Sequence, residues 1–216
     1  MILSRGRGYI FIHAPKTGGT SMALALEGRA MKDDIMLGDT PKAKKRRRHL
    51  AGVNARGRLW KHSTLADLEG LLEPGEAERL FAFTLVRNPF DRVVSYYHWL
   101  QTQRFDHPAV GLAKRLDFEG FATHPEIAQS LAAAPARHYM TDAMGREQAD
   151  LYIRLEHFEA DAEPLWAHLG FRLELPIANR SARSADFRAY YSEASCAAVA
   201  SACAEDIAKF GYCFAP

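Results

Sequence analysis

Short apolar runs recur along the chain. Tyr9-Ile10-Phe11-Ile12-His13 is rich in β-forming residues and is closed by Pro15, Leu80–Val86 (LFAFTLV) is a second run, and Asp150–Leu155 is a third. Continuous apolar runs of this length are typical of strands that are buried on both faces of a parallel sheet. The pattern therefore predicts three such strands.

Helical spacing fills the segments between these runs. Ser21–Glu27 is expected to be a helix that stops at Gly28, and Asn88 is expected to cap a helix that begins at Pro89. Further helices are expected at Leu65–Leu72, at residues 117–133, around Leu165 and at Glu193–Phe210. Strands that alternate with helices predict an α/β fold with a parallel sheet flanked by helices on both faces. We expect residues 1–216 to form a single domain.

Residues 30–60 lack this periodicity and are expected to form a long, partly mobile loop. Within it, Lys42–Arg48 (KAKKRRR) holds six basic residues and no acidic one, whereas the whole chain has a net charge of only +2. Such a charge is too small to predict nucleic-acid binding. The basic run either attracts an anionic acceptor, such as an acidic saccharide, or is a solvated loop.

The chain has neither an apolar stretch long enough to span a bilayer nor an N-terminal pattern typical of a signal peptide. We therefore expect a cytoplasmic protein. Its three cysteines, Cys196, Cys203 and Cys213, have no metal-ligand or redox spacing and are expected to be buried free thiols.

The turn after the first strand has the chemistry of a phosphate cradle. In Pro15-Lys16-Thr17-Gly18-Gly19-Thr20-Ser21, the glycines allow the backbone to approach an anion, and the start of the following helix offers N–H groups. Lys16 adds a positive charge, and the hydroxyls of Thr17, Thr20 and Ser21 add donors. The alternative is an ordinary glycine-containing turn, because the segment matches neither GxxxxGK[ST] nor GxGxxG.

A second anion site is predicted at the end of the second strand. In Val86–Tyr97 (VRNPFDRVVSYY), Arg87 leaves the carboxyl end of a buried strand, where ligands of open parallel sheets bind. Ser95 lies about 10 Å further along the helix axis. The two side chains could hold a phosphate, and the alternative is a surface arginine with a neutral helical serine.

Together the two segments resemble those of sulfotransferases, which use 3′-phosphoadenosine 5′-phosphosulfate (PAPS). PKTGGTS resembles the loop that binds the 5′-phosphosulfate, and RNPFDRVVSYY resembles the segment whose Arg and Ser hold the 3′-phosphate. The branch with the carbohydrate O-sulfotransferases is the closer match. Three later segments resemble that branch too: Tyr152–Glu156, Leu175–Ser181 and Glu205–Tyr212. The resemblance implies a P-loop-like fold with PAPS as the donor. Arg180 of the late loop is expected to reach the 3′-phosphate, and the alternative is a solvated loop arginine.

Sulfuryl transfer needs positioning, charge stabilisation on the leaving phosphate and a base for the acceptor hydroxyl or amine. Lys16 is the candidate for charge stabilisation. The sequence has no acidic cluster beside the loop, so no metal ion is expected. His62 stands where the family often places its catalytic histidine, and the alternative is a capping or solvent-exposed histidine. His98 is the second candidate base, whereas His13 is expected to be structural or to support the site.

Two other functions remain open at this point. A nucleotide kinase would need a lysine after the glycines, a Mg²⁺-binding Ser or Thr and a strand-terminal Asp, of which only fragments are present. A non-catalytic protein that binds PAPS or an acidic glycan would keep the anion sites without depending on His62. The sequence leaves the acceptor and the oligomeric state undefined.

Overall fold

A computed structural model describes residues 1–176 and 183–215 of the chain. The chain divides into two compact units. The first contains Met1–Val86 and Ala136–Ala178, and the second contains Arg87–Pro135 and Asn179–Pro216. The chain enters the second unit directly after the second predicted strand.

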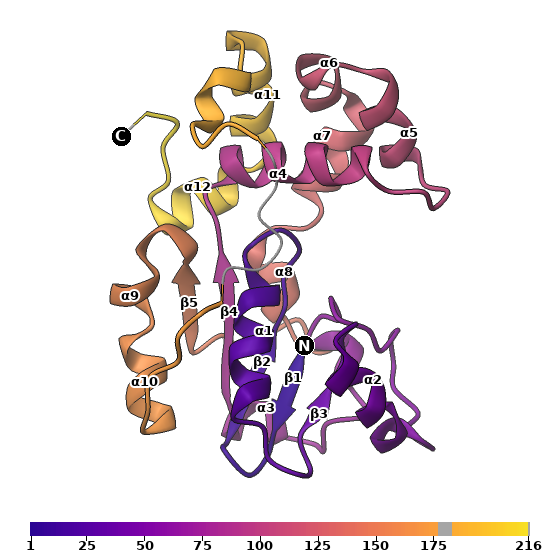
Figure 1. Cartoon of the computed structure of the whole chain (residues 1–216), viewed down its shortest axis with the longest axis vertical. Helices are drawn as coiled ribbons and strands as arrows, with labels where there is room; N and C mark the ends of the chain where they lie inside the picture. Colours follow the sequence, from indigo (N-terminus) through magenta and orange to yellow (C-terminus); the bar gives the residue numbers. More distant parts are fainter. Residues whose placement is uncertain (177–182, 216) are drawn as a thin grey trace. The chain divides into compact units, whose positions relative to one another are not determined.

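The first unit is built on a five-stranded mixed sheet with the strand order β3-β1-β2-β4-β5. The strands are β1 (Ile2–Ser4), β2 (Tyr9–Ile12), β3 (Ile35–Met36), β4 (Phe81–Val86) and β5 (Leu151–Arg154). The central strands β2, β4 and β5 are parallel, so that β4 and β5 point the same way in Figure 1. The three predicted strands and the α/β fold are confirmed.

Two antiparallel edge strands make the sheet mixed rather than purely parallel. β1 pairs with β2 and with β3, and Ile2 lies opposite Phe11. The first residues, Met1, Ile2 and Leu3, are buried, because the turn at Gly8 folds them back onto β2. β1 and β3 are too short for a periodic pattern to reveal them.

Helices cover both faces of this sheet. On one face, Phe11, Phe83 and Ile153 pack with Met22 and Leu26 of α1 (Gly19–Gly28). The same cluster takes in side chains of α2 (Pro41–Arg46) and α10 (Glu163–Leu169). On the other face, α8 (Ala136–Met140) contacts β4. The remaining helices of the unit are η1 (Arg47–Leu50), η2 (Ala66–Leu68), α3 (Glu76–Arg79), η3 (Leu155–His157) and α9 (Phe158–Asp161).

The structure adds short elements to one segment expected to be a loop and contradicts one expected helix. Residues 30–60 are not wholly irregular, because Thr40 caps α2 by accepting a hydrogen bond from Ala43 N, and the basic run continues through η1. Leu65–Leu72 is not a helix beyond the single turn η2. The N–H of Leu65 donates to Tyr139 O instead of starting a longer helix, and Gly70 adopts a φ of 90°.

The second unit is helical and is organised around α4 (Pro89–Gln101), whose apolar side forms one core with the helices after it. Asn88 caps α4 as predicted, with Oδ1 accepting from Phe90 N at 3.1 Å. The other elements are α5 (Pro108–Arg115), α6 (Phe118–Ala122), α7 (Pro125–Ala132), η4 (Phe187–Tyr190), α11 (Glu193–Ala202) and α12 (Ala204–Phe210).

Two long helices expected in this unit are each divided. Residues 117–133 form α6 and α7, because the His124 ring accepts from Glu126 N and Pro125 opens a new helix. Glu193–Phe210 forms α11 and α12, with the interruption at Cys203, where φ is −108° and ψ is 21°. Strong hydrophobic spacing continued across both interruptions and concealed them.

The three cysteines are free thiols, as predicted, but of the three only Cys203 is buried, whereas Cys196 is half-buried and Cys213 is exposed. In the described part of the chain, no helix is long and apolar enough to cross a membrane. Among the same residues, no three His, Cys, Asp or Glu side chains are grouped as a metal ion would require.

Candidate active site

The glycine-rich turn connects β2 to the start of α1 at the carboxyl end of the parallel strands. Gly18 has a φ of 85°, and its oxygen accepts from Ser21 N at 3.0 Å, which starts the helix. Among the described residues, no group accepts from the N–H of Gly18, Gly19 or Thr20. The N–H groups at a helix start form an anion site of the predicted kind.

The two glycines leave no room for side chains. A Cβ atom at Gly19 would lie 2.1 Å from Cδ2 of His13, and one at Gly18 would lie 2.8 Å from a methyl carbon of Leu155. Gly18 also has a positive φ, which side chains rarely tolerate. The sequence therefore needs glycine at both positions in order to bring the loop backbone this close to its neighbours.

Two other residues, Lys16 and Thr17, define the conformation of this loop. Lys16 is the one residue other than glycine with a positive φ (66°) among those described. Such strain in a loop is commonly retained for function. The buried Thr17 hydroxyl donates to Ala14 O at 2.9 Å, so its proton is used within the loop. Thr20 and Ser21 lie in the first turn of α1 and are partly exposed.

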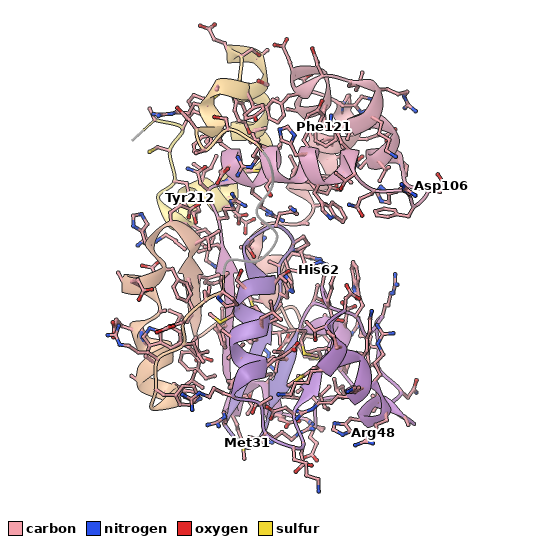
Figure 2. All side chains as sticks on the ribbon, viewed as in Figure 1. Met31, Arg48, His62, Asp106, Phe121 and Tyr212 are labelled. Atoms are coloured by element: carbon pink, nitrogen blue, oxygen red, sulfur yellow. The ribbon has the colours of Figure 1, made fainter. Side chains whose placement is uncertain are left out.

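His62 lies in the first unit beside the first turn of α1 (Figure 2), and its Nδ1 is 2.7 Å from the main-chain oxygen of His13. A carbonyl oxygen can only accept, so Nδ1 carries the proton and Nε2 keeps its basic lone pair. The His62 ring also contacts the ring of His13 at 4.6 Å and that of Trp60 at 5.0 Å, both edge to face. This tautomer is the one that a base using Nε2 requires.

Burial keeps both histidines neutral. It is the largest cause that lowers the pKa of His62 to about 4, and it lowers the pKa of His13 well below its ordinary value. The hydrogen bond to His13 O acts in the opposite direction on His62, because it favours the protonated ring. At neutral pH, His62 is therefore present as the free base.

The loop that carries His62 is fixed by hydrogen bonds of its neighbours. Ser63 is fully buried, and its hydroxyl accepts from Trp60 N at 2.9 Å and lies 2.8 Å from Arg58 O. Thr64 and Asp67 bond each other's backbone, with Thr64 N donating to Asp67 Oδ2 at 2.8 Å. His62 therefore sits on an irregular but well-supported segment, rather than directly before a regular helix.

In the second unit, Arg87 and Arg183 share one carboxylate. Arg87 Nε donates to Oδ2 of Asp91 at 2.9 Å, and Arg183 Nη2 donates to Oδ1 of the same residue. The three side chains are 9–18% exposed. Two guanidinium groups and one carboxylate leave a net positive charge in a partly buried place, where charge is only partly screened.

Ser95 and His98 lie further along α4. Ser95 is 6% exposed. The ring of His98 contacts the rings of Tyr97 and Tyr190, and its buried Nε2 has no hydrogen-bond partner within the described chain. Burial and the nearby charge of Arg183 lower the pKa of His98. His98 is thus also neutral near pH 7 and is still the second candidate base.

Comparison with known families gives one match. The family model described as "Sulfotransferase family" matches residues 1–164, which is most of the chain. The chain belongs to the Sulfotransferase family. Its members are PAPS-dependent enzymes, so the predicted activity and sulfuryl donor are confirmed at that level, whereas the carbohydrate branch is not. Searches of curated proteins and of solved structures give no match.

The loop of this sulfotransferase suits the 5′-phosphosulfate of PAPS. It combines N–H groups at a helix start with the charge of Lys16. It also has two glycines at positions where a Cβ atom would clash with neighbouring side chains. Arg87 and Arg183 supply the net charge that a phosphate requires, with the Ser95 hydroxyl two turns along α4. Each group of residues, taken within its own unit, has the chemistry of an anion site.

The predicted site residues divide between the units. Lys16–Ser21 and His62 belong to the first unit, whereas Arg87, Ser95 and His98 belong to the second. Arg180 lies outside the described residues. Reasoning from the sequence missed Arg183 and Asp91 as partners of this cluster, and it missed Trp60 as a neighbour of His62. An arginine three positions after Arg180 was the available signal for Arg183.

Proposed function

We propose that this sulfotransferase moves the sulfuryl group of PAPS to a hydroxyl or amine of a saccharide, with His62 as the base. The observation that carries the proposal is the hydrogen bond between His62 Nδ1 and His13 O, which leaves Nε2 as the acceptor of a proton. The family match supports the donor and the reaction class. The resemblance to the carbohydrate O-sulfotransferases supports the saccharide.

The donor supplies an activated sulfuryl group on a phosphate that leaves with negative charge. Lys16 and the N–H groups of Gly18, Gly19 and Thr20 are proposed to bind the 5′ end and stabilise that charge. The hydroxyls of Thr20 and Ser21 add donors, whereas Thr17 acts through the loop conformation. Arg87, Ser95 and Arg180 are proposed to hold the 3′-phosphate.

On the acceptor side, His62 Nε2 takes the proton of the attacking hydroxyl or amine. The acceptor atom forms a bond to sulfur as the bond between sulfur and the bridging phosphate oxygen breaks, and the leaving group is adenosine 3′,5′-bisphosphate. His62 needs no prior deprotonation at neutral pH, because burial already holds it neutral. General base catalysis of this kind contributes about 10²–10⁴-fold.

The basic run suits an acidic saccharide. Four of its residues, Lys44, Lys45, Arg47 and Arg48, are exposed along α2 and η1, and Figure 2 labels Arg48 at the outer edge of this segment. The other two support the fold instead. Lys42 Nζ donates to Glu27 O, and Arg46 Nη1 donates to Met31 O. A fixed, exposed set of four positive charges can attract a polyanionic acceptor.

The test is transfer of labelled sulfate from PAPS to a panel of neutral sugars, acidic sugars, phenols and peptides. We expect product with saccharides, greatest with acidic ones, and transfer that is about 10²–10⁴-fold slower with the His62→Ala variant. Transfer to phenols or peptides alone would show that the acceptor class is wrong. Binding of PAPS without transfer to any acceptor would favour the non-catalytic alternative.

A further inference from the structure

His13 makes two contacts that meet at the proposed reaction centre. Its main-chain oxygen accepts from His62 Nδ1 at 2.7 Å, and the Cδ2–Nε2 edge of its ring occupies the place where a side chain of Gly19 would lie. One residue therefore touches both the proposed base and the first turn of the phosphate-binding helix.

The sheet does not fix the direction of that carbonyl group. Ile12 is the last residue of β2, where it pairs with Thr84 of β4, and His13 follows beyond the end of the ladder. The direction of the His13 carbonyl is therefore left to contacts outside the sheet, and the packing of the His13 ring is one of them. The ring is 7% exposed and lies between Phe11, at 6.0 Å in a stacked arrangement, and His62 at 4.6 Å.

The His13 ring meets Gly19 by packing. The residue is more than nine-tenths buried, and Cδ2 and Nε2 of its ring lie 2.1 and 2.5 Å from the position that a Cβ atom at Gly19 would take. The shape of the ring, rather than its hydrogen bonding, is what fills the space beside Gly19. Glycine at position 19 is the sequence feature that makes this space available.

We propose that His13 is a positioning residue for the base. The ring, wedged against Gly19, holds the His13 carbonyl at the end of β2, and that carbonyl holds His62 in the tautomer with the proton on Nδ1. Nε2 of His62 is thereby kept both unprotonated and correctly directed. The flat ring is the required property, so an aromatic side chain without nitrogens serves in its place.

This inference rests on the proposed role of His62, and the two are tested apart. The variants are His13→Phe, which keeps the wedge, and His13→Ala, which removes it. His13→Asn is made as well, in case the alanine variant does not fold. It also removes the ring but leaves a smaller cavity than alanine does. The tautomer of His62 is read by long-range ¹H–¹⁵N NMR without donor or acceptor, and binding of adenosine 3′,5′-bisphosphate is measured by calorimetry.

We expect His13→Phe to keep the Nδ1–H tautomer of His62 and the parental kcat. His13→Ala and His13→Asn should show a mixture of tautomers and a kcat lowered by about 10–100-fold, the scale of loss that misplacement causes. Affinity for adenosine 3′,5′-bisphosphate should change in none of them.

An unchanged His62 tautomer and kcat in the alanine or asparagine variant would overturn the inference. Loss of nucleotide affinity in His13→Phe would also overturn it, because the ring nitrogens would then contact the donor. Normal turnover of His62→Ala is a separate outcome. It would show that His62 is not the base, whatever the NMR spectra of the His13 variants show.

Discussion

Nδ1 of His62 donates to the main-chain oxygen of His13 across 2.7 Å, and this bond decides which nitrogen of His62 can act as a base. Two residues 49 positions apart in the sequence are thus joined at the carboxyl end of β2. Burial of the pair then determines how the site responds to pH.

The pH dependence of turnover follows from the low pKa of His62, which is lowered to about 4 by burial. A base must be unprotonated, so kcat/KM should rise through that pKa and be flat from about pH 5 upward. The measurement is kcat/KM for the parent and for His62→Ala, which should lose the rising limb. A parental limb centred near pH 6.5 would show that His62 is not buried as described.

Acid stability gives an independent check of the same burial. In the unfolded chain, His62 titrates near its ordinary pKa of 6.5, whereas in the folded chain it titrates near 4. Between these values the unfolded state binds more protons, so the free energy of unfolding falls as the pH falls through this window. The contribution of His62 is at most about 3 kcal/mol.

Denaturant unfolding of the parent and of His62→Gln, measured at several pH values, tests this. The glutamine variant should lose less stability than the parent between neutral pH and pH 4. Parallel curves for parent and His62→Gln would contradict the account.

Recognition of the 3′-phosphate should depend on Arg87. Adenosine 3′,5′-bisphosphate should raise the melting temperature of the parent more than AMP does, because only the former has a 3′-phosphate for the cluster to bind. A ligand at a concentration of 100 times its Kd adds about 2.7 kcal/mol to the free energy of unfolding. In Arg87→Ala the two nucleotides should give similar shifts. Arg188→Ala, which alters an exposed pair with Asp186, is the control and should keep the difference. Equal shifts in the parent would mean that the 3′-phosphate site is misassigned.

The six basic residues of Lys42–Arg48 should fall into two groups, one that recruits the acceptor and one that supports the fold. Replacement of Lys44, Lys45, Arg47 and Arg48 by Gln should raise the KM of an acidic acceptor and weaken its salt dependence, because these side chains are exposed. Stability and donor binding should stay as they are. Lys42→Gln with Arg46→Gln should instead lower stability, because both side chains donate to backbone oxygens. Unaltered acceptor kinetics in the first variant would leave the basic segment as a solvated surface.

Long or chemically distinctive features of the fold could be predicted from the sequence. The strands at Tyr9–Ile12 and Phe81–Val86 are continuous apolar runs, and the Asn88-Pro89 pair marks a capped helix start. β1 and β3 have three and two residues, so no period can be read from them. The breaks within the two long helical patterns depend on local capping and backbone angles, which hydrophobic spacing does not register.

The candidate site was predictable in its residue types but not in its contacts. Glycine at positions 18 and 19 and lysine at position 16 mark an anion loop without any structure. The bond from His62 to His13 O joins two segments distant in sequence, and a main-chain acceptor leaves no trace in side-chain composition. The pairing of Arg183 with Asp91 could not be predicted for a similar reason, because it joins residues 92 positions apart in the sequence.

The central claim is that Lys16 serves the donor and His62 serves the acceptor. The most direct measurement is single-turnover transfer of labelled sulfate from PAPS by the parent, Lys16→Ala, His62→Ala and His98→Ala, together with the affinity of each for adenosine 3′,5′-bisphosphate. Lys16→Ala should lose both affinity and rate, and His98→Ala should keep parental transfer. His62→Ala should bind the nucleotide as the parent does and transfer sulfate about 10²–10⁴-fold more slowly. Near-normal transfer by His62→Ala, with loss in His98→Ala, would contradict the account and make His98 the base.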